Sequence, residues 1–105
     1  MNIVIIGLGL IGGSIAKELS EIKDINILAF DKNHQSIENA LANKTINGFI
    51  DNLDELTIEK YNDSLVIIAT PPRASLEILG ALSFLFNSNI TITDTSSTKS
   101  ALEEI

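Results

Sequence analysis

Apolar residues along this chain gather in short runs that alternate with longer segments of mixed character. The runs at 3–6 and 65–69 have no polar residue, which is typical of parallel strands that are covered on both faces. Together the runs predict five strands, at residues 3–6, 25–30, 49–50, 65–69 and 90–93.

In the mixed segments, apolar residues recur every three or four positions, which is the spacing of one helix face. The segment after the first strand has such a stripe, formed by Ile11, Ile15, Leu19 and Ile22. A second helix is predicted over residues 36–44, with Asn33 or Ser36 as its cap.

A third helix is predicted over residues 73–86, and its apolar residues lie nearly all round it. That distribution favours neighbours on more than one side of the helix. The polar segment 51–63 is expected to hold a short helix or turn. Strands and helices alternate without internal repeats, so we predict one three-layer α/β domain with a doubly wound parallel sheet in the strand order 3-2-1-4-5.

Three glycines follow the first predicted strand at the spacing of the dinucleotide fingerprint G-x-G-x-x-G. In that motif Gly7 makes the tight turn, Gly9 lets the backbone approach a pyrophosphate, and Gly12 lets helix and strand pack closely. Asp31 ends the second strand, where the fingerprint requires an acidic residue that holds the adenosine ribose. The sequence therefore predicts a Rossmann-like dinucleotide-binding domain.

The carboxyl ends of parallel strands share one edge of the sheet, so three loops are expected to meet there. These loops are the glycine loop from Gly7 to Gly12, the rigid turn from Thr70 to Arg73 and the loop from Asp94 to Lys99. The cofactor-binding residues predicted on these loops and at the end of the second strand are Gly7, Leu8, Gly9, Leu10, Ile11, Gly12, Asp31, Lys32, Thr70, Pro71 and Asp94. His34 and Arg73 are interpreted as solvated surface residues.

Asp31 also bears on the choice of cofactor, because its carboxylate disfavours a 2′-phosphate at the ribose. Lys32 offsets part of that repulsion, and we expect NAD to be preferred over NADP. Seven basic and fourteen acidic residues give a formal net charge of −7, and the basic residues are scattered singly. This distribution argues against nucleic acid and anionic membranes as partners.

The chain contains no cysteine, which excludes disulfides and thiolate metal sites and suits a reducing cytoplasm. No apolar stretch approaches the roughly 20 residues of a membrane span. No metal site is predicted.

The motifs together resemble the amino-terminal half of the prephenate and arogenate dehydrogenases. The matching segments are Gly-Leu-Gly-Leu-Ile-Gly-Gly-Ser at 7–14, Asp31, Ala-Thr-Pro at 69–71 and Asp-x-x-Ser-x-Lys at 94–99. The resemblance implies NAD-dependent oxidative decarboxylation of prephenate, or of arogenate, in tyrosine biosynthesis. It also implies a homodimer formed through a helical second domain that these residues do not include.

By the same resemblance, Ser97 is the catalytic serine near the nicotinamide and the substrate hydroxyl, and Asp94 and Lys99 shape its loop. Ser96 departs from the glycine that many members carry. A helix-capping role for Ser97 is the alternative. The catalytic histidine of the family lies beyond Ile105, so we expect the isolated chain to bind NAD without oxidising prephenate.

Ser100 and Glu103 have the spacing of a capping box, which marks a helix start close to the last residue. We therefore expect the chain to be a piece of a longer protein. Two other functions stay open at this point: a Rossmann-type reductase of a small acid or imine, and a module that senses NAD or NADH without turnover. A longer gene with a histidine motif and a helical tail would favour the dehydrogenase.

Overall fold

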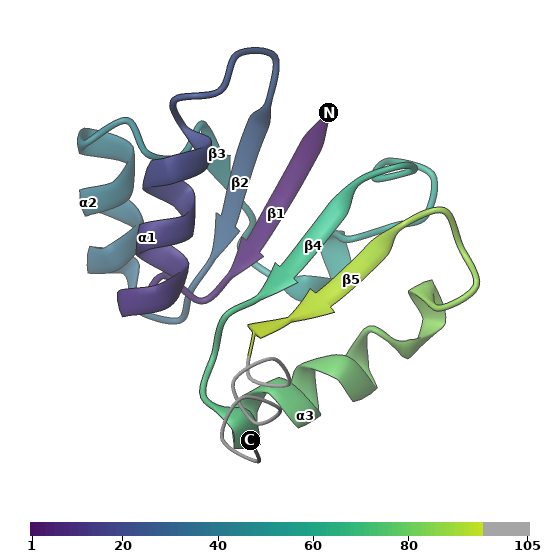
Figure 1. Ribbon diagram of the computed structural model, residues 1–105. Helices are drawn as coiled ribbons and strands as arrows, with labels where there is room; N and C mark the ends of the chain where they lie inside the picture. The colour runs from purple at the N-terminus through teal and green to yellow at the C-terminus, as the bar shows by residue number, and fades with distance from the viewer. Residues whose placement is uncertain (96–105) are drawn as a thin grey trace, which may run out of the picture.

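The computed structural model describes residues 1–95, which form a five-stranded parallel sheet in the order β3-β2-β1-β4-β5 (Figure 1). This confirms the predicted fold class and strand order. In chain order the elements are β1 Asn2–Ile6, α1 Leu10–Leu19, β2 Asn26–Phe30, α2 His34–Ala42, β3 Gly48–Phe49, the 3₁₀ helix η1 Leu53–Glu55, β4 Leu65–Ile68, α3 Pro72–Ala81, the 3₁₀ helix η2 Ser83–Leu85 and β5 Thr91–Asp94.

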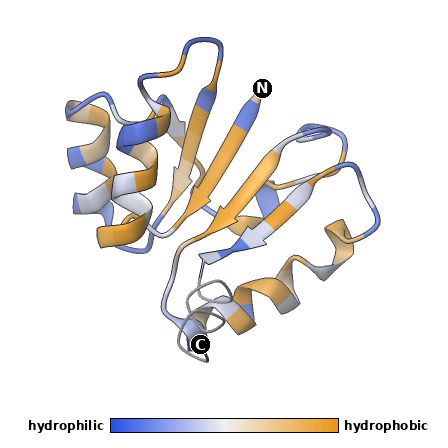
Figure 2. Ribbon diagram, in the orientation of Figure 1, coloured by the Kyte–Doolittle hydropathy of each residue, from blue (hydrophilic) through white to orange (hydrophobic). Residues whose placement is uncertain are grey.

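The central strand β1 supplies side chains to both cores, because successive residues of a strand point to opposite faces of the sheet. Ile3 and Ile5 belong to the core that includes Ala16 of α1 and Ile37 of α2. Val4 and Ile6 belong to the core on the face of α3. The strands form the apolar centre of the molecule in Figure 2, with helices on both faces, as predicted for a doubly wound sheet.

The contact face of α1 matches the predicted stripe in part, because Ile15 and Leu19 are partly buried and pack against the core. Its buried residues are Gly12 and Ala16, whereas Ile11 is exposed. Ile22 is also exposed, because α1 ends at Leu19 and Ile22 lies beyond it. The prediction missed Gly12 and Ala16, the small residues that are fully buried where the helix approaches the sheet most closely.

The helix predicted over residues 73–86 is shorter and less covered than expected. It ends at Ala81, and the chain continues through η2. Leu76 is 73% exposed, and Phe84 and Phe86 are exposed too, so the prediction of neighbours on several sides is wrong for the described residues. The break after Ala81 allows Leu82 and Leu85 to reach the core, where both are buried.

The smaller predictions for the chain ends and caps have mixed outcomes. Asn33 caps α2 by accepting a hydrogen bond from the Gln35 backbone N–H at 3.0 Å, so Asn33 and not Ser36 is the cap.

Ser96, Ser97, Lys99 and the capping box of Ser100 and Glu103 lie outside the described residues. Within residues 1–95 no helix combines the length and the apolar character that a membrane crossing needs.

Replacing Gly12 with alanine is expected to destabilise the fold. A Cβ atom at Gly12 would lie 1.8 Å from the carbonyl oxygen of Gly7, a backbone atom that cannot turn aside as a flexible side chain can. Overpacking of this kind costs about 1–3 kcal/mol or more. Urea unfolding monitored by circular dichroism should show the loss.

The control for that experiment is Gly80→Ala, because a Cβ at Gly80 meets no atom of residues 1–95 within 4 Å. Alanine is the better helix former, so this variant should gain roughly 0.5–1 kcal/mol. Equal stability of the Gly12→Ala variant and the unmodified chain would show that α1 does not approach β1 as described.

Candidate functional site

The glycine loop leaves β1 through a turn that only glycine adopts without strain. Gly7 has a φ of +99°, and a Cβ there would lie 2.8 Å from Thr70 Cγ2 and 2.9 Å from the Ala69 carbonyl oxygen. Its backbone N–H donates to the Phe30 carbonyl oxygen at 2.8 Å. The turn is thus held between the ends of β2 and β4.

Gly9 differs from Gly7 and Gly12, because nothing among residues 1–95 requires a glycine at this position. Its φ is −71°, an ordinary value, and a Cβ built there meets no atom within 4 Å. The residue is exposed and lines an open cavity. A side chain at Gly9 would therefore extend into free space at the start of α1.

The start of α1 presents unpaired backbone donors to that space. The first hydrogen bond at this end runs from Gly13 N–H to the Gly9 carbonyl oxygen at 2.8 Å. Within residues 1–95, the N–H groups of Leu10, Ile11 and Gly12 have no partner. The first turn has no acidic side chain, so the positive end of the helix dipole is not compensated there. Such an end favours an anionic oxygen.

Asp31 connects the end of β2 to the glycine loop. Its Oδ2 accepts a hydrogen bond from the Leu8 backbone N–H at 2.7 Å, and its Oδ1 accepts one from the Asn33 backbone N–H at 2.8 Å. A carboxylate has about four lone-pair sites, so both oxygens can accept further bonds. Asp31 can therefore hold a ligand hydroxyl while it keeps the loop in place.

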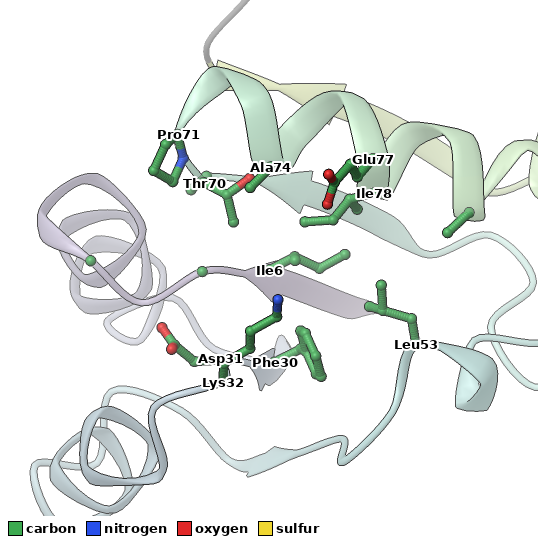
Figure 3. Close-up of a pocket in the computed structure, with 14 residues that line it drawn as sticks. Ile6, Phe30, Asp31, Lys32, Leu53, Thr70, Pro71, Ala74, Glu77 and Ile78 are labelled. Carbon is green, nitrogen blue, oxygen red and sulfur yellow. The ribbon is translucent and has the colours of Figure 1, made fainter.

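A cavity of about 530 Å³ extends from the glycine loop along one face of the sheet (Figure 3). This volume is within the usual range of small-molecule sites. The residues that line it are Ile6, Gly7, Gly9, Phe30, Asp31, Lys32, Leu53, Ala69, Thr70, Pro71, Ala74, Glu77, Ile78 and Ala81. Most are apolar, and the charged groups among them belong to Asp31, Lys32 and Glu77.

A pair of hydroxyl groups supports the turn between β4 and α3. Thr70 Oγ1 and Ser75 Oγ lie 2.8 Å apart, and Ser75 Oγ also donates to the Thr70 carbonyl oxygen at 3.1 Å. Ser75 is buried, so its hydroxyl needs these partners. The bonds hold Thr70 at the edge of the cavity beside Gly7.

The structure brings six of the predicted cofactor residues together in the wall of this cavity: Gly7, Gly9, Asp31, Lys32, Thr70 and Pro71. Of the other predicted residues, Leu8 contributes its amide to Asp31, while Leu10 and Ile11 begin α1 with exposed side chains. Gly12 packs beneath Gly7. Asp94 ends β5, pairs in register with Ile68, and is not among the described residues that line the cavity.

The sequence interpretation missed the apolar half of the cavity and one charged residue in it. The missed lining residues are Ile6, Phe30, Leu53, Ala69, Ala74, Glu77, Ile78 and Ala81. A signal was present, because Ala74, Ile78 and Ala81 have the spacing of one helix face directly after the Thr70–Pro71 turn. Leu53 carried no such signal, since η1 reaches the cavity only through the tertiary fold.

His34 is exposed at the start of α2, as predicted, and it lines a second cavity of about 250 Å³ next to Phe49 and Asp51. In the described part of the chain, no three histidine, aspartate or glutamate side chains are grouped as metal ligands.

Comparison with known proteins gives relatives along nearly the whole chain. A profile of the TrkA-N domain family matches residues 3–104. A prephenate dehydrogenase of Lactococcus lactis subsp. cremoris is 37% identical over 106 residues, which cover 99% of this chain and 28% of that protein.

Two solved structures share the fold. The prephenate dehydrogenase from A. aeolicus, solved in complex with hydroxyphenyl propionate and NAD+, superposes with a TM-score of 0.76 and 29% identity over 90% of this chain and 32% of that one. The arogenate dehydrogenase from Synechocystis has a TM-score of 0.68 at 20% identity over the same shares, and it supports the fold alone. The chain thus spans about a third or less of the length of these relatives.

Proposed function

The chain belongs to the TrkA-N domain family, and from this premise we propose that it is the NAD-binding domain of a prephenate dehydrogenase-like oxidoreductase. The observation that carries the proposal is the free space at Gly9, where the protein itself sets no demand for a glycine. A pyrophosphate placed there would meet the unpaired amides of Leu10, Ile11 and Gly12. A Cβ at Gly9 would occupy the same space.

The remaining cofactor contacts follow from the ends of β2 and β4. Asp31 would accept hydrogen bonds from the hydroxyls of the adenosine ribose while it retains the Leu8 amide. Thr70 and Pro71 would form the opposite wall of the groove. The hydroxyl pair of Thr70 and Ser75 keeps this wall in place before any ligand enters.

The proposed reaction of the whole enzyme is the oxidative decarboxylation of prephenate, or of arogenate. Bound NAD would accept the hydride from the substrate, while the protein supplies binding, orientation and electrostatics. We propose Ser97 as the residue near the substrate hydroxyl, supported by its place in the Asp-x-x-Ser-x-Lys motif at 94–99. Asp94, at the end of β5, would lead into that loop. A homodimer formed through a helical second domain is part of the same proposal.

Gly9→Ala should weaken NAD binding by tenfold or more, a change of about 1.4 kcal/mol or more. The reason is that the new methyl group takes the space of a phosphate oxygen. In urea unfolding, Gly9→Ala should lose much less stability than Gly12→Ala. The only expected cost is that alanine is a poorer N-cap residue than glycine. Isothermal titration calorimetry with NAD measures the affinity, and Gly80→Ala serves as the control. Unchanged affinity of the Gly9→Ala variant would contradict the proposed phosphate position.

NAD should bind more tightly than NADP, because the Asp31 carboxylate repels a 2′-phosphate. Two unit charges 4 Å apart repel by about 4 kcal/mol at an effective dielectric constant near 20, and by less in salt. The dissociation constant of NADP divided by that of NAD should therefore exceed one. Asp31→Ala should lower this ratio toward one, as measured by calorimetry with both dinucleotides. Glu38→Ala, a change at an exposed glutamate outside both cavities, should leave the ratio unchanged. Tighter binding of NADP by the unmodified chain would refute this preference.

A further inference from the structure

The end of the cavity that lies beyond Asp31 has no role in the contacts proposed so far. We propose, on the basis of the proposed NAD binding, that Glu77 accepts a hydrogen bond from the exocyclic amino group of the adenine base. Glu77 would then distinguish adenine from purines that carry a carbonyl at that position.

The walls of this part of the cavity suit a flat, apolar ring. Ile6 and Phe30 lie at the ends of β1 and β2, and Leu53 approaches from η1. On the opposite side, α3 contributes small and aliphatic side chains, those of Ala74, Ile78 and Ala81. Figure 3 shows Leu53, Phe30 and Ile78 around the same space. Burial of a base between such walls is favourable, but it does not select one purine over another.

The direction of the ligand follows from the position of the glycine loop. Gly7 lies against Thr70, so the phosphate end of the cavity is the end at which α3 begins. Glu77 is five residues beyond Pro72, the first residue of α3, which corresponds to about 7.5 Å along the helix axis. In Figure 3 Thr70 and Pro71 lie toward one end of the cavity and Glu77 lies farther along it. A ribose held by Asp31 thus places its base beside Glu77.

Glu77 stands on an otherwise apolar helix face, and its side chain has no partner among the described residues. Ala74, Ile78 and Ala81 share that face and line the cavity with it. Among residues 1–95, the side chains of Glu77 and Lys32 form no hydrogen bond and no ion pair, although both residues line the cavity. An ionised carboxylate only accepts hydrogen bonds. It therefore matches the N–H of an amino group and repels a carbonyl oxygen.

The test compares NAD with its deaminated analogue, in which hypoxanthine replaces adenine and a carbonyl replaces the amino group. Calorimetry on the 105-residue chain should give a dissociation constant about tenfold higher for the analogue than for NAD, a difference of about 1.4 kcal/mol. Glu77→Gln should reduce this ratio to threefold or less, because the side-chain amide can donate to the carbonyl. NAD and its analogue carry the same phosphates. Any effect of the lost charge on phosphate binding therefore cancels in the ratio of their dissociation constants.

Glu38→Gln is the matched control, since Glu38 is exposed and lines neither cavity. It should keep the tenfold ratio. Circular dichroism should show both variants folded, because Glu77 is exposed and its side chain makes no hydrogen bond within the described residues. Equal binding of the two dinucleotides by the unmodified chain, or an unchanged ratio in Glu77→Gln, would overturn the assignment of Glu77 and leave NAD binding intact. Failure of both dinucleotides to bind would overturn the proposed function together with this inference.

Discussion

The close packing of α1 against the end of β1 is the constraint on which the site depends. It requires a backbone without a side chain at Gly12, because the carbonyl oxygen of Gly7 occupies the position of a Cβ atom. It also requires the left-handed turn at Gly7. Together these place the first turn of α1, with its unpaired amides, at the carboxyl edge of the sheet. A side chain at position 12 would move α1 away from β1 and turn the unpaired amides out of the groove.

Local dipoles, and not the overall charge, make this edge a site for an anion. The chain has a formal net charge of −7, which repels anions at long range. The amides at the start of α1 act at short range, and no acidic side chain lies in the first turn. The nearby carboxylate of Asp31 is directed at the Leu8 and Asn33 amides. The remaining lone pairs of Asp31 favour hydroxyls over phosphates. The start of α1 thus favours an anion, whereas the adjacent end of β2 favours a hydrogen-bond donor.

The sheet and the phosphate end of the site could be predicted because they depend on local sequence. Runs of apolar residues predicted the strands, the alternation of strands and helices predicted their order, and the spacing of Gly7, Gly9 and Gly12 located the loop. The other end depends on tertiary contacts. Leu53 reaches the cavity from a segment without regular periodicity, and the role of Glu77 depends on which face of α3 covers the sheet. The apolar composition of α3 suggested burial all round, whereas within the described part of the chain one side of the helix packs and Leu76 on the other is exposed.

The central claim is that the amides at the start of α1 bind the pyrophosphate of NAD. The most direct measurement is a titration of the ¹⁵N-labelled chain with NAD, followed by two-dimensional amide spectra. The account predicts saturable shifts that are largest at the N–H groups of Gly9, Leu10, Ile11 and Gly12, with smaller shifts at Asp31 and Thr70. Saturable shifts that spare the start of α1, or spectra that do not change at millimolar NAD, would contradict it.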